Sequence, residues 1–175
     1  MTEDCAECGF VYDLELAPSA ASLAGEYAAR FAEFLLRAER AALARRAAPG
    51  VWSPLEYACH VRDVLLVQRE RVLSARRTET PVATPMGRDE RAEHEGYAFQ
   101  DPADVARQLT DAASLFGNVL DRLPPAHWER TLVYTYPEPA ERSLRWLAVH
   151  TLHELRHHLL DVHRQLPGPP PAADD

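Results

Sequence analysis

The feature that most restricts the fold of this chain is a repeated helical spacing of apolar residues, interrupted at a few points by proline and glycine. In four long stretches, apolar side chains recur at steps of three and four residues, which places them on one face of a helix. Ala, Leu, Arg and Glu, which are good helix formers, are abundant in these stretches. The 175 residues suffice for one domain with an ordinary core. The pattern therefore predicts an all-α protein, a four-helix bundle with long connections.

Start and stop signals give approximate bounds for the helices. The clearest is Ser53-Pro54-Leu55-Glu56, in which the serine caps the helix, the proline occupies the first turn and the glutamate reaches back to the cap. Trp52, just before it, could pack against the first turn as a hydrophobic staple. Pro49-Gly50 and Pro124-Pro125 act as stops. We expect helices over about 20–47, 53–77, 101–124 and 143–165.

The connections divide the chain further. Residues 78–100 form a long connection, which is typical of a functional loop or of a segment with a short helix of its own. Residues 126–140 should be irregular or briefly extended. Two long connections favour a bundle with a crossover over a simple up-and-down series. We interpret 1–17 as a lead segment, 18–166 as the bundle and 167–175 as a disordered tail.

The charge of the chain excludes several classes of function. A net charge of −8 disfavours nucleic-acid and anionic-membrane partners, because both are bound through clustered cations. The chain contains no lysine, which excludes a Schiff base or a P-loop. No apolar run approaches the roughly 20 residues that span a bilayer, and no signal-peptide pattern is present. We expect a cytoplasmic protein with reduced cysteines.

Histidine is concentrated near the end of the chain. Five of the 8 histidines lie in the last predicted helix: His150, His153, His157, His158 and His163. His153 and His157 are four residues apart, so both imidazoles lean over one helical face and could bind one metal ion. His60 lies within an otherwise apolar helix and needs a polar partner. Spacing alone also allows surface or hydrogen-bonded histidines, and we assign His158 and His163 mainly to the surface.

Two motifs resemble signatures of the DinB-like superfamily. Trp52-Ser53-x-x-Glu56-x-x-x-His60 resembles the second-helix signature, and His153-x-x-x-His157 with Asp161 resembles the fourth-helix signature. The resemblance covers about residues 19–165. It implies a DinB-like four-helix bundle in which His60, His153 and His157 bind a divalent ion, zinc or nickel, with coordination positions left for water or substrate.

The resemblance also implies a class of activity. The superfamily includes transferases and isomerases that use a low-molecular-weight thiol, mycothiol or bacillithiol, to act on a small electrophile. A homodimer is a further expectation from the family. Glu154 stands where other residues are frequent, and it would act as a general base or orient an imidazole. The alternative is a non-catalytic or stress-related bundle in which the metal only stabilises the fold.

A second motif competes for the same residues. His153-Glu154-Leu155-Arg156-His157 matches the H-E-x-x-H pattern of metallohydrolases, with His163 at the offset of a third ligand. The longer form of that pattern needs a glycine where this chain has Leu160. Leu160 should instead keep the helix going and carry His163 away from the ion.

The pair Cys5-x-x-Cys8 is the last candidate. It resembles one knuckle of a zinc ribbon but supplies two of the four ligands that a structural site needs. Three interpretations remain: free surface thiols, a second metal site completed by His150 or His158, or a metal shared across a dimer. Cys59 is interpreted as a small core residue.

Overall fold

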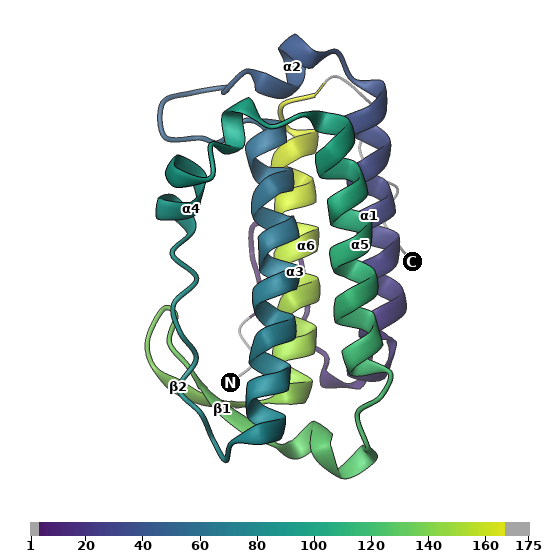
Figure 1. Ribbon diagram of the computed structural model, residues 1–175, viewed down its shortest axis with the longest axis vertical. Helices are drawn as coiled ribbons and strands as arrows, with labels where there is room; N and C mark the ends of the chain where they lie inside the picture. Colours follow the sequence, from purple (N-terminus) through teal and green to yellow (C-terminus); the bar gives the residue numbers. More distant parts are fainter. Residues whose placement is uncertain (1–3, 167–175) are drawn as a thin grey trace.

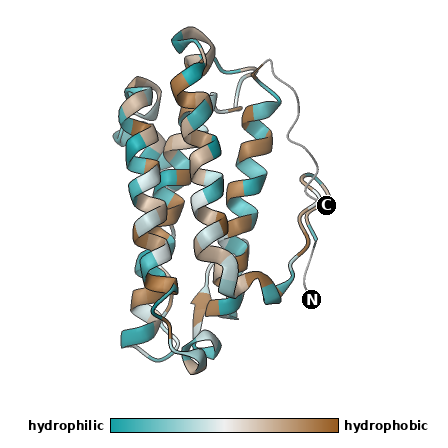
Figure 2. Cartoon of the chain, turned by 90° about the vertical axis from the view of Figure 1, so that its right-hand side faces the viewer, coloured by the Kyte–Doolittle hydropathy of each residue, from teal (hydrophilic) through white to brown (hydrophobic). Residues whose placement is uncertain are grey.

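The computed structural model describes residues 4–166, and four long helices that lie side by side make up most of it (Figure 1). The predicted all-α class and the four-helix bundle are therefore confirmed. Brown and teal residues alternate along these helices in Figure 2, as expected when each helix turns an apolar face to the core. The long helices are α1 (Ala20–Arg37), α3 (Pro54–Arg77), α5 (Pro102–Leu120) and α6 (Leu144–His163).

The order of the helices includes the predicted crossover. The colours in Figure 1 show α1 and α6 running upward and α3 and α5 running downward, so the consecutive helices α3 and α5 are parallel. The connection after α3 must return along the whole bundle. It contains α4 (Arg88–His94) and the 3-10 turn η2 (Tyr97–Phe99), in agreement with the expectation of a short helix.

Short elements complete the ends of the bundle. β1 (Thr131–Tyr134) and β2 (Ala140–Ser143) form an antiparallel hairpin before α6, in the region expected to be briefly extended. The connection after α3 also touches this hairpin, because Val133 N–H donates to Pro81 and Ala83 N–H donates to Val133, each at 2.9 Å. The other short elements are η1 (Leu14–Ser19), α2 (Arg40–Ala44) and η3 (Pro125–Glu129).

The predicted capping box at the start of α3 is present. Ser53 accepts from the Glu56 N–H, and Glu56 accepts from the Ser53 N–H. The Trp52 ring lies 5.8 Å from the Tyr57 ring, which is the predicted staple. Arg46 binds both oxygens of Glu56. These contacts fix the entry of α3 and hence the position of His60, two turns further along.

The first predicted helix is too long. The chain leaves helical geometry at Ala38, whose ψ is 151°, and forms the separate short helix α2 instead of continuing to Ala47. No proline or glycine marks this break. It places Leu43, which is only 1% exposed, in the core over α3, so tertiary packing overrides the local helix propensity here. The predicted tail 167–175 lies outside the described residues.

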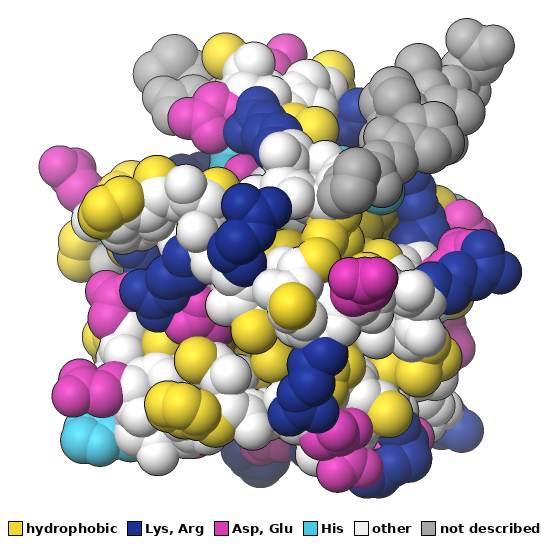
Figure 3. Space-filling view, turned by 90° about the horizontal axis from the view of Figure 1, so that it is seen from above, with side chains coloured by type: hydrophobic (Ala, Val, Ile, Leu, Met, Phe, Trp, Pro, Cys, Tyr) yellow, Lys and Arg dark blue, Asp and Glu magenta, His cyan; other side chains and the backbone are white. Residues whose placement is uncertain are grey.

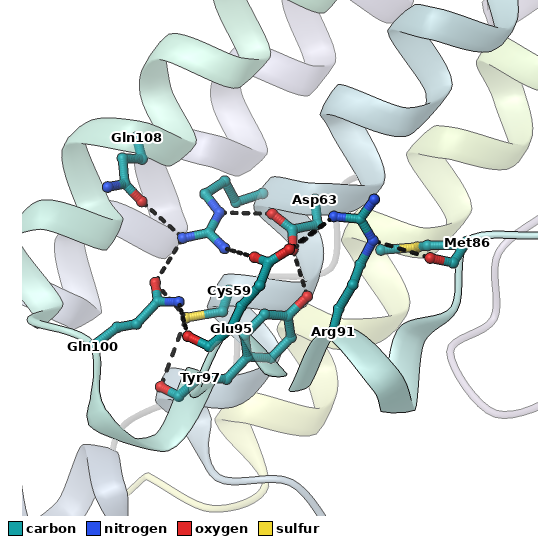
Figure 4. A network of polar contacts seen from close by, with 9 residues as sticks. Cys59, Asp63, Met86, Arg91, Glu95, Tyr97, Gln100 and Gln108 are labelled. Carbon is teal, nitrogen blue, oxygen red and sulfur yellow. Dashed lines mark hydrogen bonds and ion pairs between the residues drawn. The ribbon is translucent and has the colours of Figure 1, made fainter. Parts of the chain in front are cut away.

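The long connection is fastened to the bundle by a buried polar network (Figure 4). Asp63 on α3 is 3% exposed, accepts from the Tyr97 hydroxyl, and accepts from Arg62 Nε at 2.8 Å. Arg62 also donates to Gln100 and Gln108, each at 2.7 Å. The network therefore links α3, η2 and α5, and it holds the connection against the bundle.

The surface at the α2 end has a mixed charge. Arginine and acidic side chains are interspersed on this face, seen from above in Figure 3. Among the described residues, no helix is long and apolar enough to cross a membrane.

Candidate metal centre

A cavity of about 450 Å³ lies between α3, α6 and the long connection, and histidines of both helices line it. Val64, Val67 and Met86 give it apolar walls. The polar and charged side chains that line it are His60, Gln68, Arg71, Arg88, Tyr134, Thr135, Tyr136, His150, His153, Glu154, His157 and His158. Its volume is in the range of sites for small molecules.

The structure distributes the predicted ligands over different groups. Within the described residues, three sets of candidate ligand atoms lie within 4.8 Å of one another: His60, Glu154 and His158; Cys5, Cys8, His153 and His157; and His150, His153 and Glu154. The predicted pair of His153 and His157 is together, but no set joins either of them to His60. His60 is joined instead to Glu154 and His158, which follow His153 and His157 directly on α6.

The rotation of α6 explains this difference. Neighbouring residues on a helix are about 100° apart around the axis. Glu154 and His158 face α3 and His60, while His153 and His157 face the cysteine turn of the lead segment. His158 had been assigned mainly to the surface, yet its side chain is 14% exposed. The spacing of Glu154 and His158, also four residues, was the available signal for this second pair.

His60 is a buried imidazole packed against two other rings. It is 4% exposed, and its ring packs against Trp52 at 5.1 Å and against His158 at 4.9 Å. Its Nδ1 has no hydrogen-bond partner among the described residues. Burial, together with the nearby charge of His158, lowers the pKa of His60 to about 3, so this ring is neutral and can offer a lone pair.

Glu154 and His158 form a buried pair next to it. Glu154 Oε2 lies 3.7 Å from His158 Nε2, and His158 Nδ1 lies 3.0 Å from an oxygen of Asp161. Although burial opposes both charges, the histidines around Glu154 hold its pKa well below the usual range. Burial also opposes the charge on His158, but Asp161 and Glu154 raise its pKa to about 9. Glu154 is therefore an anion suited to bind a cation rather than to donate a proton.

The other wall of the cavity carries a fixed positive charge. The Arg71 guanidinium lies over the Tyr134 ring at 4.7 Å and donates to its hydroxyl at 3.1 Å. Arg71 also donates to Gln68 at 3.1 Å and to the Thr84 carbonyl at 2.8 Å. These contacts hold the guanidinium in place opposite the imidazoles.

The cysteine pair does not meet the histidines that were expected to complete it. Cys5 Sγ lies 3.6 Å from His157 Nδ1, and Cys8 is buried. His150 is occupied elsewhere, because its Nδ1 lies 2.8 Å from the Tyr12 hydroxyl. The expected partners His150 and His158 are thus replaced by His153 and His157, again because of the rotation of α6.

The metallohydrolase arrangement is not formed. Helix α6 continues without interruption through Leu160 to His163, as the sequence predicts. Glu154 Oε1 lies 3.5 Å from His153 Nδ1, but no set of candidate ligand atoms joins Glu154 to His157. Cys59 is fully buried, and burial raises the pKa of its thiol to about 12, which agrees with a core role.

Comparisons with known proteins agree on the fold. The sequence model of the DinB superfamily matches residues 16–162. Among solved structures, YfiT from Bacillus subtilis, described as a probable metal-dependent hydrolase with an unusual four-helix bundle topology, is 16% identical over 86% of each chain, with a TM-score of 0.77. A mycothiol-dependent maleylpyruvate isomerase is 15% identical over 86% of this chain and 61% of its own, with a TM-score of 0.68. No curated protein sequence matches this chain.

Proposed function

Because this chain belongs to the DinB superfamily, we propose that it is a metal-dependent enzyme whose divalent ion is held by His60, Glu154 and His158. The ion is zinc or nickel, and the reaction transfers a low-molecular-weight thiol to a small electrophile or isomerises that electrophile with the thiol as cosubstrate. The observation that carries the proposal is the convergence of two imidazoles and one carboxylate, from two helices, at the wall of a cavity of about 450 Å³.

The residues present suit a divalent cation once His158, whose pKa Asp161 and Glu154 raise to about 9, gives up its proton to the solvent. The neutral ring of His60 is buried with Nδ1 unpaired, and an unsatisfied buried polar atom costs about 1–3 kcal/mol. Glu154 contributes the negative charge that offsets part of the charge of the ion. Two imidazoles and one carboxylate are the ligand set of several catalytic zinc sites, which keep a further position open. The set proposed from sequence, His60 with His153 and His157, is replaced in this proposal by the set that shares one face.

A bound divalent ion would supply a Lewis acid that favours the thiolate form of a thiol over the thiol form. The protein contributes the arrangement around it. Asp161 accepts from His158 Nδ1 and so directs the other ring nitrogen, Nε2, toward Glu154 and His60. Arg71 offers a fixed positive charge for an anionic group of the substrate or thiol. Val64 and Met86 give the cavity an apolar wall.

The two structures of similar fold support two different candidate reactions. The isomerase similar in fold is described as mycothiol-dependent, which supports thiol chemistry in this chain. YfiT is described as a probable metal-dependent hydrolase, and the ligand set of two histidines and one carboxylate is also that of hydrolytic zinc enzymes. Hydrolysis of a small ester or amide is therefore the second candidate.

The test combines metal content with two activity assays. Purified protein loaded with zinc or nickel is assayed for consumption of mycothiol and of bacillithiol with small electrophiles, and separately for hydrolysis of small esters. We expect thiol consumption in the wild type. We also expect H60A and H158A to lose one equivalent of metal and at least 100-fold of this activity.

His94→Ala is the matched control, because His94 is an exposed histidine on α4 outside the cavity. It should retain metal and activity. Ester hydrolysis without thiol consumption would favour the second candidate. Full metal content in H60A and H158A would refute the proposed ligand set, and metal binding without either activity would favour the non-catalytic bundle.

A further inference from the structure

The cysteine pair lies on a tight turn at the start of the chain. Cys5 N–H donates to the Phe10 carbonyl at 2.9 Å, and Gly9 N–H donates to the Cys5 carbonyl at 2.8 Å. Gly9 has a φ of +66°, a left-handed conformation that glycine adopts without strain. The turn brings the two sulfur atoms together on the side that faces α6.

Two histidines of α6 face this turn. His153 and His157 are one helical turn apart, and the four candidate ligand atoms of the cluster lie within 4.8 Å of one another. In a tetrahedral zinc site with two sulfur and two nitrogen ligands, the ligand atoms lie about 3.3–3.8 Å apart, given the usual bond lengths. The distance of 3.6 Å from Cys5 Sγ to His157 Nδ1 is within that range. Small movements of the other side chains would complete the tetrahedron.

The hydrogen bonding of the two imidazoles points to a missing ligand. Both ring nitrogens of His153 are buried and make no hydrogen bond to the described residues, although Nδ1 lies 3.5 Å from Glu154 Oε1. His157 presents Nδ1 to the sulfur, while its Nε2 lies 3.5 Å from Glu7 and 3.8 Å from Asp161. A carboxylate on the nitrogen that does not bind the metal is a common feature of metal-bound histidines.

Contacts around the cluster fasten the turn to α6. The rings of Phe10 and Tyr12 lie 5.5 and 5.4 Å from the ring of His153. The Arg156 guanidinium donates to the Cys8 carbonyl at 3.2 Å. The turn is therefore packed along α6, with Phe10 and Tyr12 against the ring of His153.

We propose that Cys5, Cys8, His153 and His157 form a second metal site, a closed structural zinc centre that joins the lead segment to α6. Two thiolates and two imidazoles fill all four positions of a tetrahedral zinc ion, so this centre has no position for a substrate. It shares no ligand with the His60 group and does not depend on the proposed function. Its role is to hold the start of the chain on the helix that carries Glu154 and His158.

The test uses zinc content and cobalt spectra of the full chain. Wild-type protein with both centres filled should hold two zinc ions, and C8S should hold one. Protein loaded with cobalt in place of zinc should show the thiolate-to-cobalt charge-transfer band. We expect this band in the wild type, in H60A and in C59A, and we expect its loss in C8S and in H157A.

C59A is the matched control for the loss of a thiol, and H60A removes a ligand of the other group. Circular dichroism verifies that each variant is folded. A second measurement needs no variant: thiol titration of the wild-type protein should find two more reactive thiols after a chelator is added. Equal zinc content in C8S and wild type, no charge-transfer band in the wild type, or a Cys5–Cys8 disulfide in protein purified under reducing conditions would each overturn the proposal.

Discussion

Removal of one hydroxyl from the core gives the sharpest test of how the long connection is held. Tyr97 is fully buried, and its hydroxyl donates to the carboxylate of Asp63, which is 3% exposed. Phenylalanine has the same shape, so Y97F deletes this hydrogen bond and leaves no cavity. A hydrogen bond to a charged group contributes about 1.5–3 kcal/mol. Asp63 keeps Arg62 as a partner at 2.8 Å, so we expect a loss of about 2 kcal/mol, within that range.

Urea unfolding followed by circular dichroism measures this loss. The protein is studied with a chelator present, because bound metal would add its own linkage to stability. A loss of about 2 kcal/mol is a change of about 30-fold in the unfolding equilibrium. It should lower the midpoint of thermal unfolding by about 4–8 °C for a chain of this length. The slope of the free energy against urea should not change.

Tyr136→Phe is the control, since Tyr136 is 73% exposed and the change should stay within about 0.5 kcal/mol. A Y97F loss as small as that of the control would show that the hydroxyl and the carboxylate do not stabilise the fold. Limited proteolysis adds an independent measure, because a weaker attachment of η2 should increase cleavage within the connection. Unchanged cleavage together with the full loss of stability would refute the link between the network and this segment.

Three further predictions concern stability and binding. Burial would raise the pKa of Glu56, but contacts with Arg46 and with the cap of α3 hold it below its ordinary value. The stability that the Glu56 carboxylate contributes is therefore present at neutral pH and is lost as the pH falls below that ordinary value. E56Q should cost about 1–2 kcal/mol at pH 7 in urea unfolding, with a smaller difference from wild type near pH 3. A Cβ at Gly117 would lie 3.4 Å from Ala21, so G117V should destabilise the contact of α1 with α5 by about 1–3 kcal/mol, and equal thermal midpoints would contradict this. R71A should weaken the binding of an anionic substrate about tenfold, as measured by KM at constant metal content, while R71K should recover part of the loss.

The sequence predicts the scaffold well where local signals are strong. The capping box at Ser53 locates the start of α3 within a residue, and the Asp101 cap with Pro102 does the same for α5, because caps act over a few bonds. The predicted end of that helix at 124 lies beyond its observed end at Leu120. The break at Ala38 has no such signal. Only the fit of Leu43 into the core decides it, and that fit depends on side chains from distant parts of the chain.

The candidate site was harder to predict for a related reason. The segment from His153 to His158 contains two interleaved pairs at a spacing of four, His153 with His157 and Glu154 with His158. Periodicity treats the two pairs as equivalent. Which pair meets His60 depends on the rotation of α6 within the bundle, and a rotation of about 100° exchanges them. The partners of the cysteine pair depend on the same rotation.

The contact between Cys5 and His157 joins residues that are 152 positions apart in the chain. A ribosome adds about 5–20 residues per second, so the histidine emerges on the order of ten seconds after the cysteines. Throughout that interval the two thiols lack the imidazoles of His153 and His157. The junction between the lead segment and α6 can therefore form only after α6 has been synthesised.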